Sequence, residues 1–171
     1  MRLACITIPN FRIALERARA PELRGRPIAI GEPPPGANQV LDCSPEATAG
    51  GIRAGMTLRD ARTILPDLLL LPPDPVHYAR SSDALLDAVE DAEPLVEPGD
   101  DGIAFAAIDP HADAEEQADA AARLVRAVRD RMGVDASAGT GEGKFIAWCA
   151  ATVCAPGETL IVPAGPEEEF V

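Results

Sequence analysis

Thr7 and Pro9 lie where the first apolar run of the chain, residues 2–8, reaches a turn and an amphipathic segment follows. A strand that ends at a tight turn before a helix is a common place for an α/β enzyme to present catalytic groups. Thr7 could offer one weak hydroxyl oxygen there, whereas the side chain of Pro9 has neither a hydrogen-bond donor nor an acceptor. These two residues alone therefore present little chemistry.

Cysteine and histidine, the usual nucleophiles and transition-metal ligands, show no spacing that predicts a site. No two cysteines form a CxxC pair, and a reducing compartment would keep all four as small packed residues. The cysteines are Cys5, Cys43, Cys149 and Cys154. His77 and His111 stand far apart without a ligand cluster, and we expect both on the surface. These residues predict neither a metal nor a cofactor.

Composition and charge limit the classes of partner. The 171 residues fit one domain, or one domain with a small insertion, and only 4% of them are aromatic, so the core is built of aliphatic residues. With 28 acidic against 15 basic residues, the chain lacks the cations that neutralise phosphates, and tight DNA binding by this chain alone is not expected. The first apolar run is too short for a signal peptide or a membrane span, which predicts a cytoplasmic protein without a membrane partner.

Hydrophobic periodicity and turn residues predict the elements of the first half. Ser44 precedes Pro45 and is expected to cap a short helix that ends at Gly50, and Thr57 is expected to cap the next helix. The prolines of "EPPPGAN" exclude both helix and central strand there. The expected strands are 2–8, 26–30, 39–43 and 68–71, and the other expected helices are 11–19 and 74–92.

The second half continues the alternation of strands and helices. The expected elements are a strand at 102–109, a helix at 113–132, a strand at 134–139, a helix at 143–154 and a strand at 158–163. In the long helix, Leu124, Val125 and Val128 fall on one face and are expected to point inward. This order predicts an α+β fold of the ferredoxin-like kind, with an antiparallel or mixed sheet and helices packed on one face.

Four stretches resemble one protein family. "SPEATAGGIRAGMTLRDARTILPDLLLLPPDPVHYARSS" at 44–82 is similar to the fingers segment of Y-family (DinB/UmuC-type) translesion DNA polymerases, and "PLVEPGDDGIAFAAID" at 94–109 resembles their central palm strand. "SAGTGEGKFIAW" at 137–148 and "RAPELRGRPIAIG" at 19–31 match further family motifs. The matches keep order and spacing from residue 2 to about residue 165, which makes them specific as a set.

The resemblance implies a palm with an inserted fingers subdomain. It places a palm-like domain at residues 1–10 and 73–171 and a fingers-like insertion at 11–72. "EEEFV" at 167–171 resembles the start of a thumb domain, so the thumb and little-finger domains are expected to be absent. The sequence is then either a piece of a longer protein or a natural palm–fingers remnant.

The resemblance also implies which residues occupy the family's catalytic positions. Family members hold two divalent metals with three carboxylates for phosphoryl transfer. An ungapped match puts Thr7 and Pro9 on the D-x-D positions, and it puts Gly102 and Ile103 on the D-E pair. Arg12 falls on the steric-gate position, where the family has a bulky residue that checks the incoming sugar. The resemblance therefore predicts no metal and no catalytic residue in this chain.

The family's contacts to the nucleotide are reduced as well. Pro45 and Thr48 replace the tyrosine and arginine that contact the triphosphate in the family. Lys144 keeps the position of the phosphate-binding lysine, although a lysine at the start of a helix can equally be a plain exposed residue. One lysine cannot hold a triphosphate without metals, because an exposed ion pair is weak.

Asp100 and Asp101 offer an alternative to this register. A two-residue gap would bring them onto the D-E positions and restore part of a metal site. The gap breaks the spacing between "PLVEP" and "AF" and still leaves Thr7 and Pro9 without a carboxylate. Two aspartates after Gly99 also suit a solvated turn.

Two hypotheses about function follow from the resemblance. The preferred one is a catalytically inactive, ImuB-like member, not an enzyme, that acts as an accessory or scaffold protein in translesion synthesis and the DNA damage response. Its expected partners are proteins of that machinery, namely an error-prone polymerase, the sliding clamp or an ImuA/RecA-like accessory factor, with weak or absent DNA binding. The alternative is a weak metal-dependent nucleotidyltransferase that uses Asp100, Asp101 and Lys144.

Overall fold

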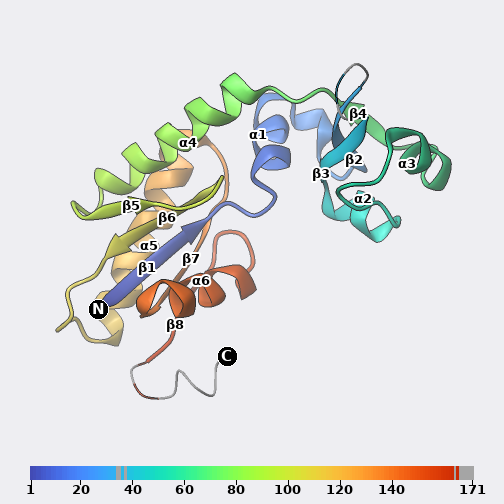
Figure 1. Cartoon of the computed structure of the whole chain (residues 1–171). Helices are drawn as coiled ribbons and strands as arrows, with labels where there is room; N and C mark the ends of the chain where they lie inside the picture. The colour runs from blue at the N-terminus through green and yellow to red at the C-terminus, as the bar shows by residue number, and fades with distance from the viewer. Residues whose placement is uncertain (34–35, 37, 164, 166–171) are drawn as a thin grey trace. The chain divides into compact units, whose positions relative to one another are not determined.

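The computed structural model describes residues 1–33, 36, 38–163 and 165 (Figure 1). The "EEEFV" segment and part of the "EPPPGAN" loop lie outside the described residues. The chain forms two compact units: unit 1 comprises Met1–Pro9 and Ala79–Val171, and unit 2 comprises Asn10–Tyr78. Within the described residues, no helix is long and apolar enough to cross a membrane.

Unit 1 contains a five-stranded sheet in the order β5-β6-β1-β7-β8 (Figure 1). Its strands are β1 (Arg2–Thr7), β5 (Val96–Pro98), β6 (Ile103–Ala107), β7 (Ser137–Glu142) and β8 (Thr159–Ile161). Neighbouring strands are antiparallel except β7 and β8, which are parallel. The central strand β1 is buried along its whole length. The predicted mixed sheet of an α+β fold is confirmed.

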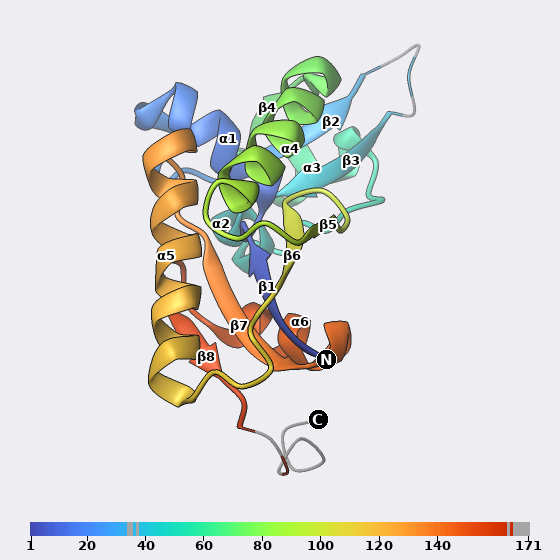
Figure 2. The same ribbon diagram turned by 90° about the vertical axis from the view of Figure 1, so that its left-hand side faces the viewer.

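Two helices, α5 (Ala114–Met132) and α6 (Gly143–Val153), cover opposite faces of this sheet (Figure 2). The hydroxyl of Thr140 donates to Gln117 of α5, whereas Gly139 and Gly141 lie against α6. Alternate residues of a strand point to opposite faces, so the prediction of helices on one face is wrong for α6. The physical reason is that the two glycines of β7 leave room for a helix on the second face.

The ends of α5 follow signals in its sequence. The Asp113 carboxylate accepts a hydrogen bond from the backbone of Glu116, and the Glu116 carboxylate accepts one from the backbone of Asp113, which forms a capping box. At the other end, Gly133 adopts the left-handed conformation with φ 68°. The residues predicted to point inward are all buried: Leu124, Val125 and Val128. The predicted helix at 113–132 is therefore confirmed.

Small residues build the core between β1, β7 and α6. Leu3 and Cys5 of β1 pack against Ala147 and Ala151 of α6. A Cβ atom placed on Gly139 would come within 2.6 Å of the Ala147 carbonyl oxygen. The close packing of β7 against α6 therefore depends on the missing side chain at residue 139.

A buried polar cluster joins β1 to α5 on the other face. Arg2 is only 7% exposed, and its guanidinium donates to Gln117 Oε1 at 2.6 Å and to the carbonyl oxygen of Val162. Gln117 Nε2 donates to the carbonyl oxygen of Ala112 at 2.8 Å, and the Thr140 hydroxyl donates to Gln117 Oε1 at 3.4 Å. Buried polar groups require partners, so Gln117 holds this cluster together.

Unit 2 contains a three-stranded sheet in the order β3-β2-β4. Its strands are β2 (Ile28–Glu32), β3 (Gln39–Cys43) and β4 (Leu69–Leu71), with β2 and β3 antiparallel and β2 and β4 parallel. Its helices are α1 (Phe11–Arg19), the 3-10 helix η1 (Pro21–Leu23), α2 (Pro45–Ala49) and α3 (Leu58–Ile64). The sheet encloses a small core formed by Ala29, Val40, Ala47, Ile52, Ala61 and Leu68.

The predicted caps of unit 2 are confirmed. Ser44 Oγ accepts a hydrogen bond from the Ala47 N–H at 3.3 Å, and Thr57 Oγ1 accepts one from the Asp60 N–H at 3.1 Å. Each cap satisfies a backbone donor that the first helical turn leaves unpaired. The positions of α2 and α3 therefore follow from local sequence.

Helix α4 (Pro75–Glu90) crosses the boundary between the units. The Tyr78 hydroxyl donates to Glu16 of α1 at 2.9 Å, and Asp74, next to the helix start, pairs with Arg19 of α1 at 3.0 Å. These contacts attach the first turn of α4 to unit 2. The compact unit therefore ends at Tyr78, whereas the fingers-like insertion was predicted to end at residue 72.

The thiol of Cys5 gives a test of the packing around β1. Cys5 is fully buried, and burial raises the pKa of its thiol to about 12, so the reactive thiolate is scarce at pH 8. We expect Cys5 to resist a short pulse of iodoacetamide, while the half-buried Cys43 and Cys149 are alkylated. Mass spectrometry of the digested protein checks this, with a sample unfolded in guanidinium as the control. Equal labelling of Cys5 and Cys149 in the folded protein would contradict the packing.

Candidate functional site

The carboxyl end of β1 and the amino end of β6 lie side by side in unit 1. Thr7 is the register partner of Ile103, and the Ile8 N–H donates to the Gly102 carbonyl oxygen at 2.8 Å. Thr7 is 8% exposed, and the half-buried Pro9 follows it. The fold thus brings Thr7, Gly102 and Ile103 together at one end of the sheet.

Asp100 and Asp101 lie in the turn that joins β5 to β6. The Ile103 N–H donates to the Asp100 carbonyl oxygen at 2.9 Å, and the Gly99 N–H donates to the Ile103 carbonyl oxygen at 3.0 Å. Gly102 adopts a left-handed φ of 77°, which this tight turn needs. Both aspartates are exposed at the end of the sheet and precede the strand.

The paired ends of β1 and β6 do not fit the two divalent metals that the resemblance implies. Thr7 supplies one hydroxyl oxygen, and the side chains of Pro9 and Ile103 have no atom that can bind a metal. Mg²⁺ sites in proteins use carboxylates. Across the described residues, no three His, Cys, Asp or Glu side chains gather as a possible metal site. We therefore derive no metal-dependent step at this position.

Lys144 lies in the first turn of α6 and is half exposed. Its ammonium pairs with the Glu97 carboxylate of β5 and lies 5.3 Å from the centre of the Phe105 ring. Both members of the ion pair are largely exposed, so the pair is weak and can exchange partners. The cation predicted to meet phosphate is therefore shared with a carboxylate and an aromatic face.

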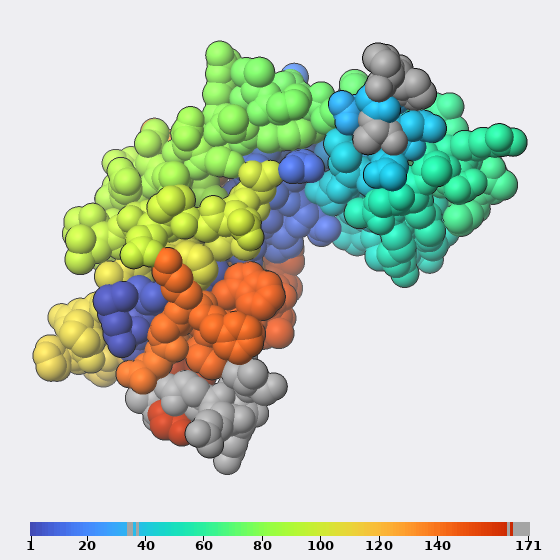
Figure 3. Space-filling view, viewed as in Figure 1, coloured from blue at the N-terminus to red at the C-terminus, as the bar shows by residue number. Residues whose placement is uncertain are grey.

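A pocket of about 600 Å³ opens between the β5–β6 turn and the start of α6. Asp100, Ile103 and Lys144 line it together with three aromatic rings, those of Phe105, Phe145 and Trp148. Side chains of the orange segment, which includes α6, lie on this face of the molecule (Figure 3). The sequence analysis missed the aromatic residues, although Phe145 and Trp148 are spaced i, i+3 and must share a face of the predicted helix.

The predicted nucleotide contacts of the fingers lie on α2, within unit 2. Pro45 is the first residue of α2 and is exposed. Thr48 is also exposed; its hydroxyl lies 3.3 Å from Cys43 Sγ, and its carbonyl oxygen accepts a hydrogen bond from Arg53 at 2.6 Å. Neither side chain offers a positive charge to a phosphate.

Arg12, at the predicted steric-gate position, is held within unit 2. Its guanidinium carbon lies 5.8 Å from the centre of the Tyr78 ring, a cation–π geometry. Burial raises the pKa of the nearby Asp42 carboxyl, and the charge of Arg12 partly opposes that shift. The Arg12 guanidinium therefore lies over an aromatic face within unit 2.

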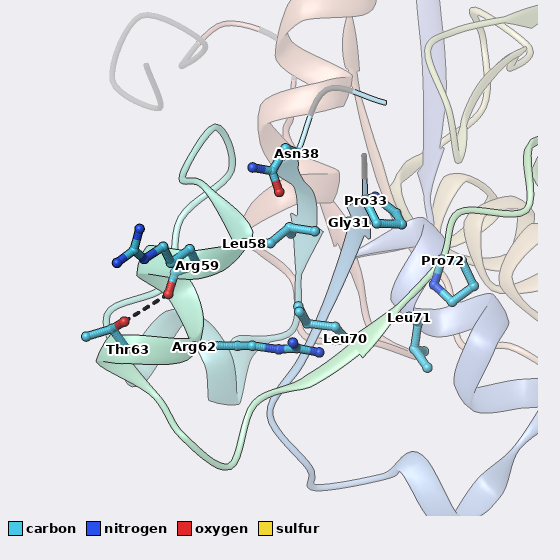
Figure 4. Close-up of a pocket in the computed structure, with 10 residues that line it drawn as sticks. All are labelled: Gly31, Pro33, Asn38, Leu58, Arg59, Arg62, Thr63, Leu70, Leu71 and Pro72. Atoms are coloured by element: carbon cyan, nitrogen blue, oxygen red, sulfur yellow. Dashed lines mark hydrogen bonds between the residues drawn. The ribbon is translucent and has the colours of Figure 1, made fainter. Parts of the chain in front are cut away.

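A second pocket, of about 750 Å³, lies between α3 and the sheet of unit 2 (Figure 4). Leu58 and Leu70 contribute apolar surface, and Arg59 and Arg62 contribute charge. Figure 4 shows Arg62 extending beside Leu70, and the Thr63 hydroxyl donating to the Arg59 carbonyl oxygen at 3.0 Å. The sequence analysis did not anticipate this pocket.

Comparisons with known proteins agree with this fold. The model of the impB/mucB/samB family matches residues 6–152. The chain is 33% identical over 163 residues to DNA polymerase IV 2 of Mesorhizobium japonicum, and 30% identical over 172 residues to DNA polymerase IV of Desulfatibacillum aliphaticivorans. These alignments cover 94% and 97% of the chain but only 38% and 42% of the relatives.

The fold is also that of a solved structure. The crystal structure of DinB from Sulfolobus solfataricus superposes with a TM-score of 0.90 over 99% of this chain and 50% of that protein. Its sequence identity is 17%, so the likeness concerns the fold. It confirms the predicted palm–fingers architecture.

The comparisons correct one prediction and leave others as predictions. The prediction that the chain is not an enzyme is wrong, because the relatives that it matches are named as DNA polymerases. The ImuB-like character stays a prediction, as does the assignment of Thr7, Pro9, Gly102 and Ile103 to the family's carboxylate positions. The match over residues 6–152 covers most of the chain, and the chain therefore belongs to the impB/mucB/samB family of Y-family DNA polymerase relatives.

Proposed function

We propose that this chain supplies the palm and fingers of a cytoplasmic protein that acts in DNA damage tolerance by translesion synthesis. The observation that carries the proposal is the family match over residues 6–152, which includes strands β2 to β7 and therefore parts of the sheets of both units. The relatives named as DNA polymerase IV support the same role.

Within that role, we propose that the chain contributes chiefly as an accessory surface for other proteins of the translesion machinery. Unit 1 carries 20 acidic and seven basic residues, a net of −13, whereas unit 2 carries eight of each. Such an acidic unit repels phosphates and favours protein partners. The donor set at Thr7 and Ile103 supports the same proposal, because it does not fit divalent metals.

DNA binding by this chain gives one test. We expect a dissociation constant of about 10⁻⁴ M or weaker for a primer–template duplex at 0.15 M salt, because non-specific binding depends on several phosphate contacts. Fluorescence anisotropy of labelled DNA measures it, with a salt titration as the control. Micromolar binding by the chain alone would contradict the accessory role.

A second candidate function is nucleotidyl transfer that uses Asp100, Asp101 and Lys144. The observation in its favour is that Asp100 and Lys144 line the same pocket. The Glu97 carboxylate beside Lys144 counts against it, because it competes with a phosphate for the ammonium.

Survival of DNA damage by the organism that encodes this chain separates the two candidates. The full-length protein with Asp100→Asn, Asp101→Asn and Lys144→Ala combined is compared with the unmodified protein in a strain that lacks the gene. The accessory role predicts survival within about threefold of the unmodified protein, because an exposed charge contributes little to docking, whereas nucleotidyl transfer predicts a loss of at least about tenfold, as for removal of catalytic groups. Asp119→Asn, on the exposed face of α5, is the control for a lost charge.

A further inference from the structure

The aromatic side chains of the chain are concentrated at one place on unit 1. The structure describes five Phe, Tyr and Trp residues, and three of them line the pocket beside the β5–β6 turn: Phe105, Phe145 and Trp148. Phe145 is 57% exposed and Trp148 39% exposed, and their ring centres lie 6.3 Å apart. Exposed aromatic residues in a cluster mark binding surfaces, because a folded protein gains little by leaving them in water.

The charges around these rings select the kind of ligand. Asp100 lines the pocket, and the Lys144 ammonium, which also lines it, pairs with the Glu97 carboxylate and lies over the face of the Phe105 ring. The whole of unit 1 carries 13 more acidic than basic residues. Nucleotides, DNA, anionic lipid and a second copy of unit 1 are therefore all disfavoured by like charge.

We propose that the aromatic pocket, formed by Asp100, Ile103, Phe105, Phe145 and Trp148, docks a basic segment of a partner protein that carries apolar side chains. An apolar side chain of the segment covers the Phe145 and Trp148 rings. Its lysine or arginine side chains meet the carboxylates of Glu97 and Asp100 and the faces of the rings, which attract cations. The proposal rests on the accessory role proposed above. The preference of the pocket for basic, apolar peptides can nevertheless be measured on the isolated chain, whatever its role in translesion synthesis.

The single tryptophan of the chain reports binding directly. Trp148 is the only tryptophan, so a ligand that covers it changes the whole tryptophan emission of the protein. Three synthetic 12-residue peptides serve as probes on the full chain: one with four leucines and four lysines, one with the leucines replaced by glutamines, and one with the lysines replaced by glutamates. Oligo-dT and dATP serve as anionic probes.

We expect the leucine–lysine peptide to shift the Trp148 emission to the blue and to bind at least about tenfold more tightly than either altered peptide, because both apolar burial and charge contribute. Phe145→Ala removes an aromatic anchor and should weaken binding about tenfold or more. Asp100→Asn removes one charge that lines the pocket and should weaken binding about two- to threefold. Val153→Ala, at a residue of α6 that is 68% exposed and outside the pocket, is the matched control and should leave binding unchanged.

Several results would overturn the proposal. These are equal binding of the lysine peptide without leucines, tighter binding of the acidic peptide, of oligo-dT or of dATP, and loss of binding in Val153→Ala. Self-association that buries Trp148 in sedimentation experiments would also overturn it, in favour of a second copy. A tenfold loss of survival in the combined variant, together with the expected peptide binding, would reject the accessory role. The preference of the pocket for a basic segment with apolar side chains would then still hold.

Discussion

Replacement of Gly139 by alanine is expected to destabilise the fold by about 3 kcal/mol or more, at the upper end of the usual cost of overpacking. The added Cβ would lie 2.5 Å from Ala150 Cβ and 2.6 Å from the Ala147 carbonyl oxygen, and it would also meet the Ala151 nitrogen. Two of these atoms belong to the backbone of α6, so the helix must move away from β7. Urea unfolding followed by circular dichroism measures the change.

Gly133→Ala is the matched control for this prediction. Gly133 follows α5 with φ 68°, and a Cβ placed there meets no atom within 4 Å. Its replacement should cost only about 1 kcal/mol, from the left-handed backbone alone. Equal costs for the two substitutions would contradict the close packing of β7 against α6.

Replacement of Gln117 by leucine is the second substitution with a large expected effect. It removes the acceptor of the Arg2 guanidinium and leaves the Ala112 carbonyl oxygen and the Thr140 hydroxyl without this partner in the interior. A hydrogen bond to a charged group contributes about 1.5–3 kcal/mol, and an unpaired buried group costs about 1–3 kcal/mol. We therefore expect a loss of about 3 kcal/mol in the free energy of unfolding, measured by the same urea titration.

Gln117→Glu separates hydrogen bonding from packing at this position. Glutamate has the same length and offers a carboxylate to Arg2, while it loses the donor to the Ala112 carbonyl oxygen. Its expected cost is smaller than that of leucine. A glutamate variant that is as unstable as the leucine variant would show that Arg2 does not depend on this acceptor.

Local signals in the sequence specify many of the helices. Ser44 and Thr57 cap their helices as predicted, because a short polar side chain satisfies a backbone donor within three residues. The expected helix at 113–132 differs by one residue from the observed α5. The four stretches that resemble the Y family can also be recognised from the sequence, since such motifs depend only on the order and spacing of residues.

Strand ends were predicted less well than helix ends. The strand expected at 134–139 is observed at Ser137–Glu142. Glycine has low strand propensity, so the sequence did not predict a strand through Gly139 and Gly141. In the structure both glycines belong to the strand because they pair with β1. Strand β5 was not predicted separately, because a strand of three residues that includes Pro98 carries no periodic signal.

The sequence by itself therefore determined the family, the mixed sheet and the residues at the end of β1. Only the tertiary structure decided what gathers around them: Thr7 meets Ile103, Lys144 meets Glu97, and Phe105 of β6 joins Phe145 and Trp148 of α6. The physical reason is that these neighbours come from separate elements. Their contacts depend on strand register and on the face that each helix covers, and no local pattern of residues encodes either.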